Sequence, residues 1–180
     1  MKVVAVFGSP HKNGPSSEIA RAVLRGAKDA GHEVVEYVIN DMNVKGCQGC
    51  GACKEMKIDC VLQDDLQPYW KDLHECGALV VAAPNYCSQV NGPMITYMNR
   101  HYCLITWDSG PRIHPGIKLV GVFSQGAERY ETADKAYDWF LRDFQNRDMV
   151  LHAKIVHTGN DSYEEGSEIF KQAYEAGRSL

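Results

Sequence analysis

Four of the seven cysteines in this 180-residue chain lie within fourteen residues, at Cys47, Cys50, Cys53 and Cys60. Their spacing is C-x2-C-x2-C-x6-C. Zinc sites more often use two C-x2-C pairs held well apart, so that four sulfurs form a tetrahedron. Three cysteines at three-residue steps, with a fourth nearby, are typical of the compact runs that bind an iron–sulfur cubane. We therefore expect a [4Fe–4S] cluster on these four residues, with zinc or free redox-active thiols as the alternatives.

Glycines accompany the cysteine run at Gly46, Gly49 and Gly51. They let the backbone curl closely and offer N–H groups to the sulfurs. Two of the remaining cysteines, Cys76 and Cys103, fall in predicted helices and are interpreted as small core residues. The odd total and the tight cluster argue against a framework of disulfides.

A second segment able to do chemistry is GSPHKNGPSS, residues 8–17, between a predicted strand and a predicted helix. It is neither a Walker A loop nor a G-x-G-x-x-G fingerprint. A hydroxyl-rich turn at a helix N-terminus still offers backbone N–H groups and a favourable dipole to a phosphate. Ser9, Ser16 and Ser17 add donors without a cation, which suits a single terminal phosphate. The alternative is an ordinary turn with a serine cap.

The elements around these segments alternate between strand and helix. The third strand is expected to end at Pro84, and Asp64 or Asp65 is expected to cap the second helix. Residues 40–63 and 104–116 show no clear periodicity. The predicted strands are 2–7, 33–38, 78–83, 118–123 and 150–157. The predicted helices are 16–30, one that Asp64 or Asp65 caps and whose apolar face is Leu66, Tyr69, Trp70 and Leu73, then 93–102, 133–144 and 163–176.

Five strands, most of them apolar on both faces, predict a doubly wound parallel sheet in one α/β domain. A chain that starts at the centre of such a sheet places its first and third strands side by side. Their loops diverge there and open a ligand crevice beyond the carboxyl ends of the strands. The loops at that edge are 8–16, 84–92 and 124–130, so we expect the site among them.

The segment GSPHKNGPSSEIA resembles the GSPRKNGNT-type loop of flavodoxin-like NAD(P)H-dependent FMN reductases. The similarity continues through GCQGCGACK, DCVLQDDL and APNYCSQVNGPMITYMNR, in the same order. The cysteine run makes the chain most similar to the iron–sulfur flavoprotein branch, whose compact motif ligates one [4Fe–4S] cluster. The resemblance implies a flavodoxin-like five-stranded parallel sheet in the order 2-1-3-4-5, with helices on both faces. Residues 1–180 would form one FMN-binding domain with a cysteine-rich insertion at about 45–62.

The same resemblance assigns residues to the cofactor. The first loop surrounds the FMN phosphate, with His11 in the usual arginine place and Pro15 in the usual asparagine place, so phosphate binding is expected to be weaker or more pH-dependent. Backbone amides of residues 84–89 face the pyrimidine edge of the flavin, and Tyr86 packs near the ring. No catalytic residue is assigned, because the flavin supplies the chemistry. The implied cofactor-binding residues are Ser9, His11, Asn13, Ser16, Ser17, Pro84, Asn85, Tyr86, Cys87, Ser88, Gln125 and Gly126.

Composition narrows the possible partners and location. The chain is 44% hydrophobic and 23% charged, and its 19 Lys and Arg against 23 Asp and Glu give a net charge of −4. This balance argues against a nucleic-acid binder. No apolar run approaches the length of a membrane span. The N-terminal segment MKVVAVFGSP contains too short an apolar stretch for a signal peptide. A cytoplasmic protein is expected.

The leading functional hypothesis is an FMN-dependent oxidoreductase that passes electrons between FMN and a [4Fe–4S] cluster. A cluster-free NAD(P)H-dependent FMN or quinone reductase is the first alternative, and a metal-binding redox sensor or carrier without turnover is the second. The donor would be NAD(P)H or ferredoxin, and the acceptor a small molecule or a protein. The resemblance also implies a homodimer or homotetramer, with the cysteine loop of one subunit near the flavin of another.

Overall fold

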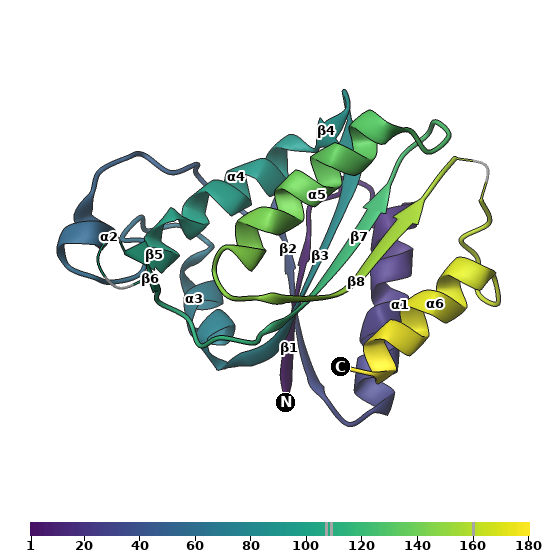
Figure 1. Ribbon diagram of the computed structural model, residues 1–180, viewed down its shortest axis with the longest axis horizontal. Coiled ribbons are helices and arrows are strands. Elements are labelled where there is room, and N and C mark those ends of the chain that lie inside the picture. The colour runs from purple at the N-terminus through teal and green to yellow at the C-terminus, as the bar shows by residue number, and fades with distance from the viewer. Residues whose placement is uncertain (107, 109, 160) are drawn as a thin grey trace.

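Five parallel strands form the central sheet, in the order β2-β1-β3-β7-β8 (Figure 1). This arrangement comes from a computed structural model that describes residues 1–106, 108, 110–159 and 161–180. The predicted order 2-1-3-4-5 is confirmed, because β7 and β8 are the fourth and fifth strands of this sheet along the chain. The strands are β1 (Lys2–Phe7), β2 (Glu33–Val38), β3 (Cys76–Tyr86), β7 (Lys118–Ser124) and β8 (Val150–His157).

Helices cover both faces of the sheet (Figure 1). On one face α1 (Pro15–Asp29) packs against α6 (Glu168–Arg178). The other face carries α3 (Gln67–Glu75), α4 (Gly92–Arg100) and α5 (Glu131–Gln145).

Strand β1 shows how its sequence produces this layering. Its residues Val3 to Val6 are all fully buried. Val3 and Ala5 join the apolar cluster beneath α1 and α6, whereas Val4 and Val6 join the larger cluster beneath α3, α4 and α5. Successive side chains of a strand point to opposite faces, so a strand covered on both sides must be apolar throughout.

The prediction that Pro84 ends the third strand is wrong. Strand β3 continues to Tyr86 and then turns back through Cys87 and Ser88 into β4 (Gln89–Val90). The pairing of β1 with β3 stops at Ala82. Pro84 lies beyond that point, so its missing N–H costs no hydrogen bond to β1. Cys87 and Ser88 have positive φ angles of 52° and 61°, as the two central residues of a type I′ hairpin do.

Two helix starts also differ from prediction. Helix α3 begins at Gln67 with Leu66 as its N-cap and no side-chain cap, and Asp64 instead pairs with Arg100. Helix α6 begins at Glu168 rather than at 163. The turn before it contains Gly166, whose φ of 91° a helix does not allow.

Short elements occupy the two segments without periodicity. Residues 40–63 contain the end of a 3-10 turn, η1 (Ile39–Asp41), and the single-turn helix α2 (Ala52–Glu55). Around residues 104–116 lie η2 (His101–Leu104) and the two-stranded pair β5 (Ile105–Thr106) and β6 (Gly110–Pro111). Cys76 is the first residue of β3, not part of a helix, and it is buried as expected. Across the described residues, no helix has the length and apolar character needed to span a membrane.

Candidate functional site

A pocket of about 410 Å³ opens at the carboxyl ends of the strands, the edge at which the sequence places the site. Eight of the twelve predicted cofactor residues line it: Ser9, His11, Ser16, Pro84, Asn85, Tyr86, Gln125 and Gly126. The other four, Asn13, Ser17, Cys87 and Ser88, do not line this pocket. Its volume lies in the range that small-molecule ligands and cofactors occupy.

Buried hydroxyls surround one end of the pocket. Ser9 and Ser16 are 5% and 1% exposed, and both reach the pocket at the N-terminus of α1. The Ser9 hydroxyl accepts the His11 amide at 3.1 Å, and the Ser17 hydroxyl donates to the His11 carbonyl at 3.2 Å. Ser17 therefore shapes the loop from behind rather than lining the pocket. Helix α1 has Gly14 as its N-cap and no side-chain cap. Pro15 has no N–H, and the Ser17 and Glu18 amides both donate to the Gly14 carbonyl at 3.0 Å.

The hairpin of β3 and β4 forms another wall. Tyr86 is 45% exposed at the pocket, as an aromatic side chain that covers a flat ligand would be. Cys87 and Ser88 lie at the hairpin tip, outside the pocket, and the Ser88 hydroxyl lies 3.3 Å from the Tyr130 hydroxyl.

The Gln125 side chain is already engaged within the protein. Its amide nitrogen donates to the Glu128 carbonyl at 2.6 Å, and its amide oxygen accepts from the Tyr137 hydroxyl at 2.7 Å. Its backbone N–H donates to the His157 carbonyl at 3.0 Å. Gln125 thus fixes the shape of the loop after β7, and its side chain can contact a ligand only through van der Waals contacts, because both of its polar atoms already have partners.

Sequence reasoning missed the wall formed by the loop after β8. His157, the last residue of β8, is 3% exposed, and its Nε2–H donates to the Asp161 carbonyl at 2.9 Å. In the neutral ring Nδ1 is then a lone-pair acceptor, and it is buried with no partner among the described residues. The only available signal was that the fifth strand ends at the same edge as the first, third and fourth.

Two further residues of that loop define the pocket. A Cβ on Gly159 would lie 2.2 Å from the Gly126 carbonyl oxygen, so only glycine allows the loops after β7 and β8 to approach this closely. The Asp161 carboxylate accepts hydrogen bonds from the Thr158 hydroxyl and amide, which hold the pKa of Asp161 below its usual value.

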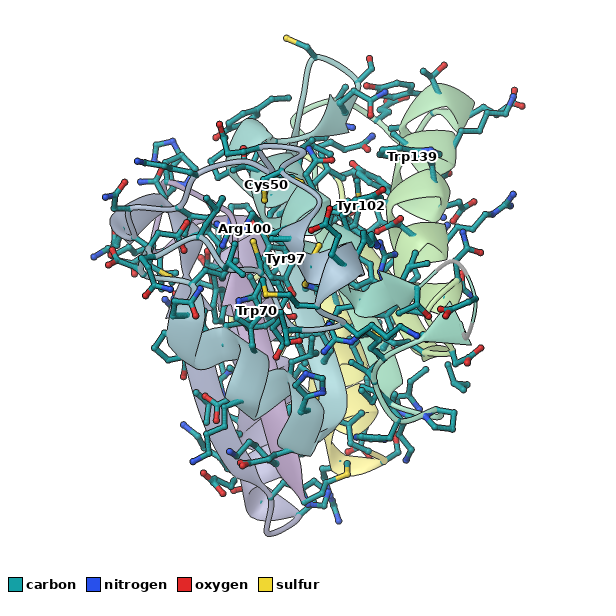
Figure 2. The ribbon with its side chains drawn as sticks, turned by 90° about the vertical axis from the view of Figure 1, so that its left-hand side faces the viewer. Cys50, Trp70, Tyr97, Arg100, Tyr102 and Trp139 are labelled. Atoms are coloured by element: carbon teal, nitrogen blue, oxygen red, sulfur yellow. The ribbon has the colours of Figure 1, made fainter. Side chains whose placement is uncertain are left out.

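All four cysteines of the motif line a second, smaller cavity, together with Arg100 and Cys103. Figure 2 labels two of these residues, Cys50 and Arg100. Burial raises the pKa of the Cys53 thiol; the positive charge of Lys54 opposes this shift, and the neighbouring cysteines add to it. Cys103 is buried as expected for a core residue, but it is also a fifth thiol at this cavity.

The backbone around this cavity turns sharply. Gly49 and Gly51 have φ angles of 64° and 78°, which favour glycine. Cys47 and Cys50 remain exposed. Within the described ranges, no group of three or more His, Cys, Asp or Glu side chains is arranged to hold a metal ion. The donor set fits a thiolate-bound cluster in its chemistry, and binding would require the cysteine loop to rearrange, because the cavity holds only about 10 Å³ and Cys47 and Cys50 face solvent.

Comparisons with known proteins relate this chain to flavin-dependent reductases and to iron–sulfur flavoproteins. A family model described as NADPH-dependent FMN reductase matches residues 1–141. An iron–sulfur flavoprotein of Methanosarcina thermophila is 26% identical over 163 residues, which cover 91% of this chain and 80% of that protein. One from Archaeoglobus fulgidus is 34% identical over 100 residues, which cover 56% of this chain but only 45% of the relative.

Solved structures show the same fold. An NAD(P)H:quinone oxidoreductase from Methanothermobacter marburgensis superposes with a TM-score of 0.73 at 18% identity, covering 100% of this chain and 96% of that one. An azoreductase from Bacillus anthracis gives a TM-score of 0.76 at 14% identity, with 100% of both chains covered.

Proposed function

Because this chain belongs to the NADPH-dependent FMN reductase family, we propose that FMN in its larger pocket exchanges electrons with a [4Fe–4S] cluster on Cys47, Cys50, Cys53 and Cys60. The observation that carries the proposal is that these four thiols line one cavity beside a buried guanidinium. Relatives named iron–sulfur flavoproteins support it. The chain is an FMN-dependent oxidoreductase, and the cluster is the part that we propose.

The pocket residues divide between the two ends of the cofactor. Ser9 and Ser16 bind the phosphate at the N-terminus of α1, since buried hydroxyls and the positive end of a helix dipole are good anion ligands. Tyr86 covers the ring, and the buried His157 Nδ1 accepts a hydrogen bond from a donor on the cofactor. When bound, FMN supplies the one- and two-electron chemistry, and the protein orients it and limits its access to water.

A cluster-free reductase that takes a hydride from NAD(P)H is the second candidate. The exposure of Cys47 and Cys50 favours it, because two of the four expected ligands face solvent. In that case the cysteine loop would be a structural or redox-active segment, and the flavin would work alone.

Iron and sulfide analysis of anaerobically purified protein tests the proposal. We expect about four irons per chain, with matching sulfide and bound FMN. Cys50→Ser should lose the iron and keep the FMN. Cys76→Ser is the matched control, because this thiol lies outside both cavities and donates to the Leu73 carbonyl, a bond that a hydroxyl can keep. Wild-type protein with full FMN and no iron would establish the cluster-free reductase instead.

A further inference from the structure

Arg100, the last residue of α4, is one of the largest fully buried side chains in the described part of the chain. A buried guanidinium is costly unless its charge is paired and its N–H groups find acceptors. Among the described residues, the hydrogen-bond partners of its side chain all belong to the segment that carries the cysteine motif. Its environment therefore bears on what that segment binds.

One guanidinium joins the two ends of the cysteine loop. Its Nη1 donates to the Lys45 carbonyl at 2.9 Å, just before the motif, and to the Asp64 carboxylate, just after it. Its Nε donates to the Cys60 sulfur at 3.2 Å. The Asp64 carboxylate in turn accepts the Lys45 amide at 3.1 Å, so the two ends are held by a charge pair and by direct hydrogen bonds.

The third guanidinium nitrogen of Arg100, Nη2, is an unpaired hydrogen-bond donor in the described part of the chain. Nη2 is buried and lacks a hydrogen-bond partner among the residues described. It carries two of the five N–H donors of the side chain. A buried donor without an acceptor is destabilising. Arg100 lines the cavity that the four cysteines share, and Figure 2 labels it together with Cys50, one of those four.

Resting on the cluster proposed above, we propose that Arg100 is its positioning residue: it fixes both ends of the cysteine loop and donates from Nε and Nη2 to sulfur atoms of the bound cluster. Hydrogen bonds to cluster sulfurs stabilise the more negative, reduced state and so raise the reduction potential. Arginine suits this role because its planar fork presents several donors in fixed directions, whereas lysine offers one compact charge.

Arg100→Lys tests the assignment, because lysine keeps the positive charge and lacks the planar guanidinium with its several N–H donors. Its matched control is Arg147→Lys, another buried arginine, which contacts the His101 carbonyl and Asp143 and does not line the cavity. The measurements are the cluster midpoint potential, from an EPR-monitored titration, and the rate of iron loss to a chelator. We expect Arg100→Lys to shift the reduction equilibrium about tenfold toward the oxidised cluster, about 59 mV for one electron, and to lose iron faster. Arg147→Lys should match the wild type in both.

FMN content and melting temperature separate this role from a general one in folding. An Arg100→Lys protein that keeps FMN and its melting temperature but holds no iron also supports the proposal. An unchanged potential and iron-loss rate would overturn it. If this variant does not fold, the neutral pair Arg100→Gln with Asp64→Asn replaces it and is judged by the same two measurements. Wild-type protein without iron would contradict the cluster proposal itself. Iron in the wild type, with an unchanged potential and iron-loss rate in the variant, would contradict only the role of Arg100.

Discussion

Asp64 and Asp65 are adjacent carboxylates with different environments. The Asp64 side chain is 1% exposed, pairs with Arg100 and accepts the Lys45 and Leu66 amides. Burial opposes its ionisation, but these hydrogen bonds prevail and lower the pKa of Asp64 below its ordinary value. Asp65 is exposed and accepts the Asn43 amide. Only Asp64 neutralises a buried charge, so only its removal should strongly affect stability.

We expect Asp64→Asn to lower the free energy of unfolding by about 3 kcal/mol at pH 7, because it leaves Arg100 buried without its counter-charge. A folded-state pKa below the unfolded value stabilises the protein above about pH 4, and this stabilisation disappears as the pH falls through the folded pKa. The difference between variant and wild type should therefore shrink toward pH 3. Urea unfolding at both pH values measures it, and Asp65→Asn should stay within about 1 kcal/mol of the wild type at pH 7. Equal losses in the two variants would contradict this account.

Residue roles were the least predictable part of the molecule. The capping interpretation of Asp64 failed because its partner Arg100 lies 36 residues further along the chain. His157 and Gly159 have no motif around them, and only the pairing of β8 with β7 brings them to the pocket. The position of Ser9 and Ser16 at the pocket was predictable, since residues 8–17 form a hydroxyl-rich turn before a helix at the carboxyl end of the first strand.

Among the elements, the strands were the most predictable. Each predicted strand coincides with an observed strand or lies within it, because long apolar runs bounded by turn residues leave few alternatives. The β3–β4 hairpin was not predictable, since its turn residues Cys87 and Ser88 rarely adopt the positive φ that the hairpin requires. The start of α6 depended on the backbone of Gly166.

The N-terminus of α1 makes a testable contribution as an element. We expect Ser16→Ala to raise the dissociation constant for FMN about tenfold, because a hydrogen bond to a charged group contributes about 1.5–3 kcal/mol. Riboflavin lacks the phosphate, so its affinity should be the same for the variant and the wild type. Fluorescence titration of the apoprotein with both ligands measures this. An equal loss of affinity for the two would place Ser16 away from the phosphate.

At the scale of the whole molecule, the two cavities share no lining residue, and the chain between them is packed with aromatic rings. His101 follows Arg100 directly and contacts Phe144 with ring centroids 5.2 Å apart. At the other end of the same series of rings, Tyr137 donates its hydroxyl to the Gln125 side chain, and Gln125 lines the larger pocket. These buried contacts form a continuous series between Arg100 and the larger pocket. The ring series runs His101, Phe144, Phe140, Phe123 and Tyr137, with centroid distances of 5.2, 5.2, 6.1 and 4.4 Å.

We propose that electrons reach the flavin through the cysteine-bound cluster. Anaerobic rapid mixing with reduced ferredoxin, a one-electron donor, tests it most directly when the flavin absorbance is followed over time. The wild type and Cys76→Ser should show fast flavin reduction, and Cys50→Ser, with FMN still bound, should be at least about tenfold slower, a barrier difference of about 1.4 kcal/mol. Flavin reduction at the same rate in Cys50→Ser and the wild type would contradict the claim.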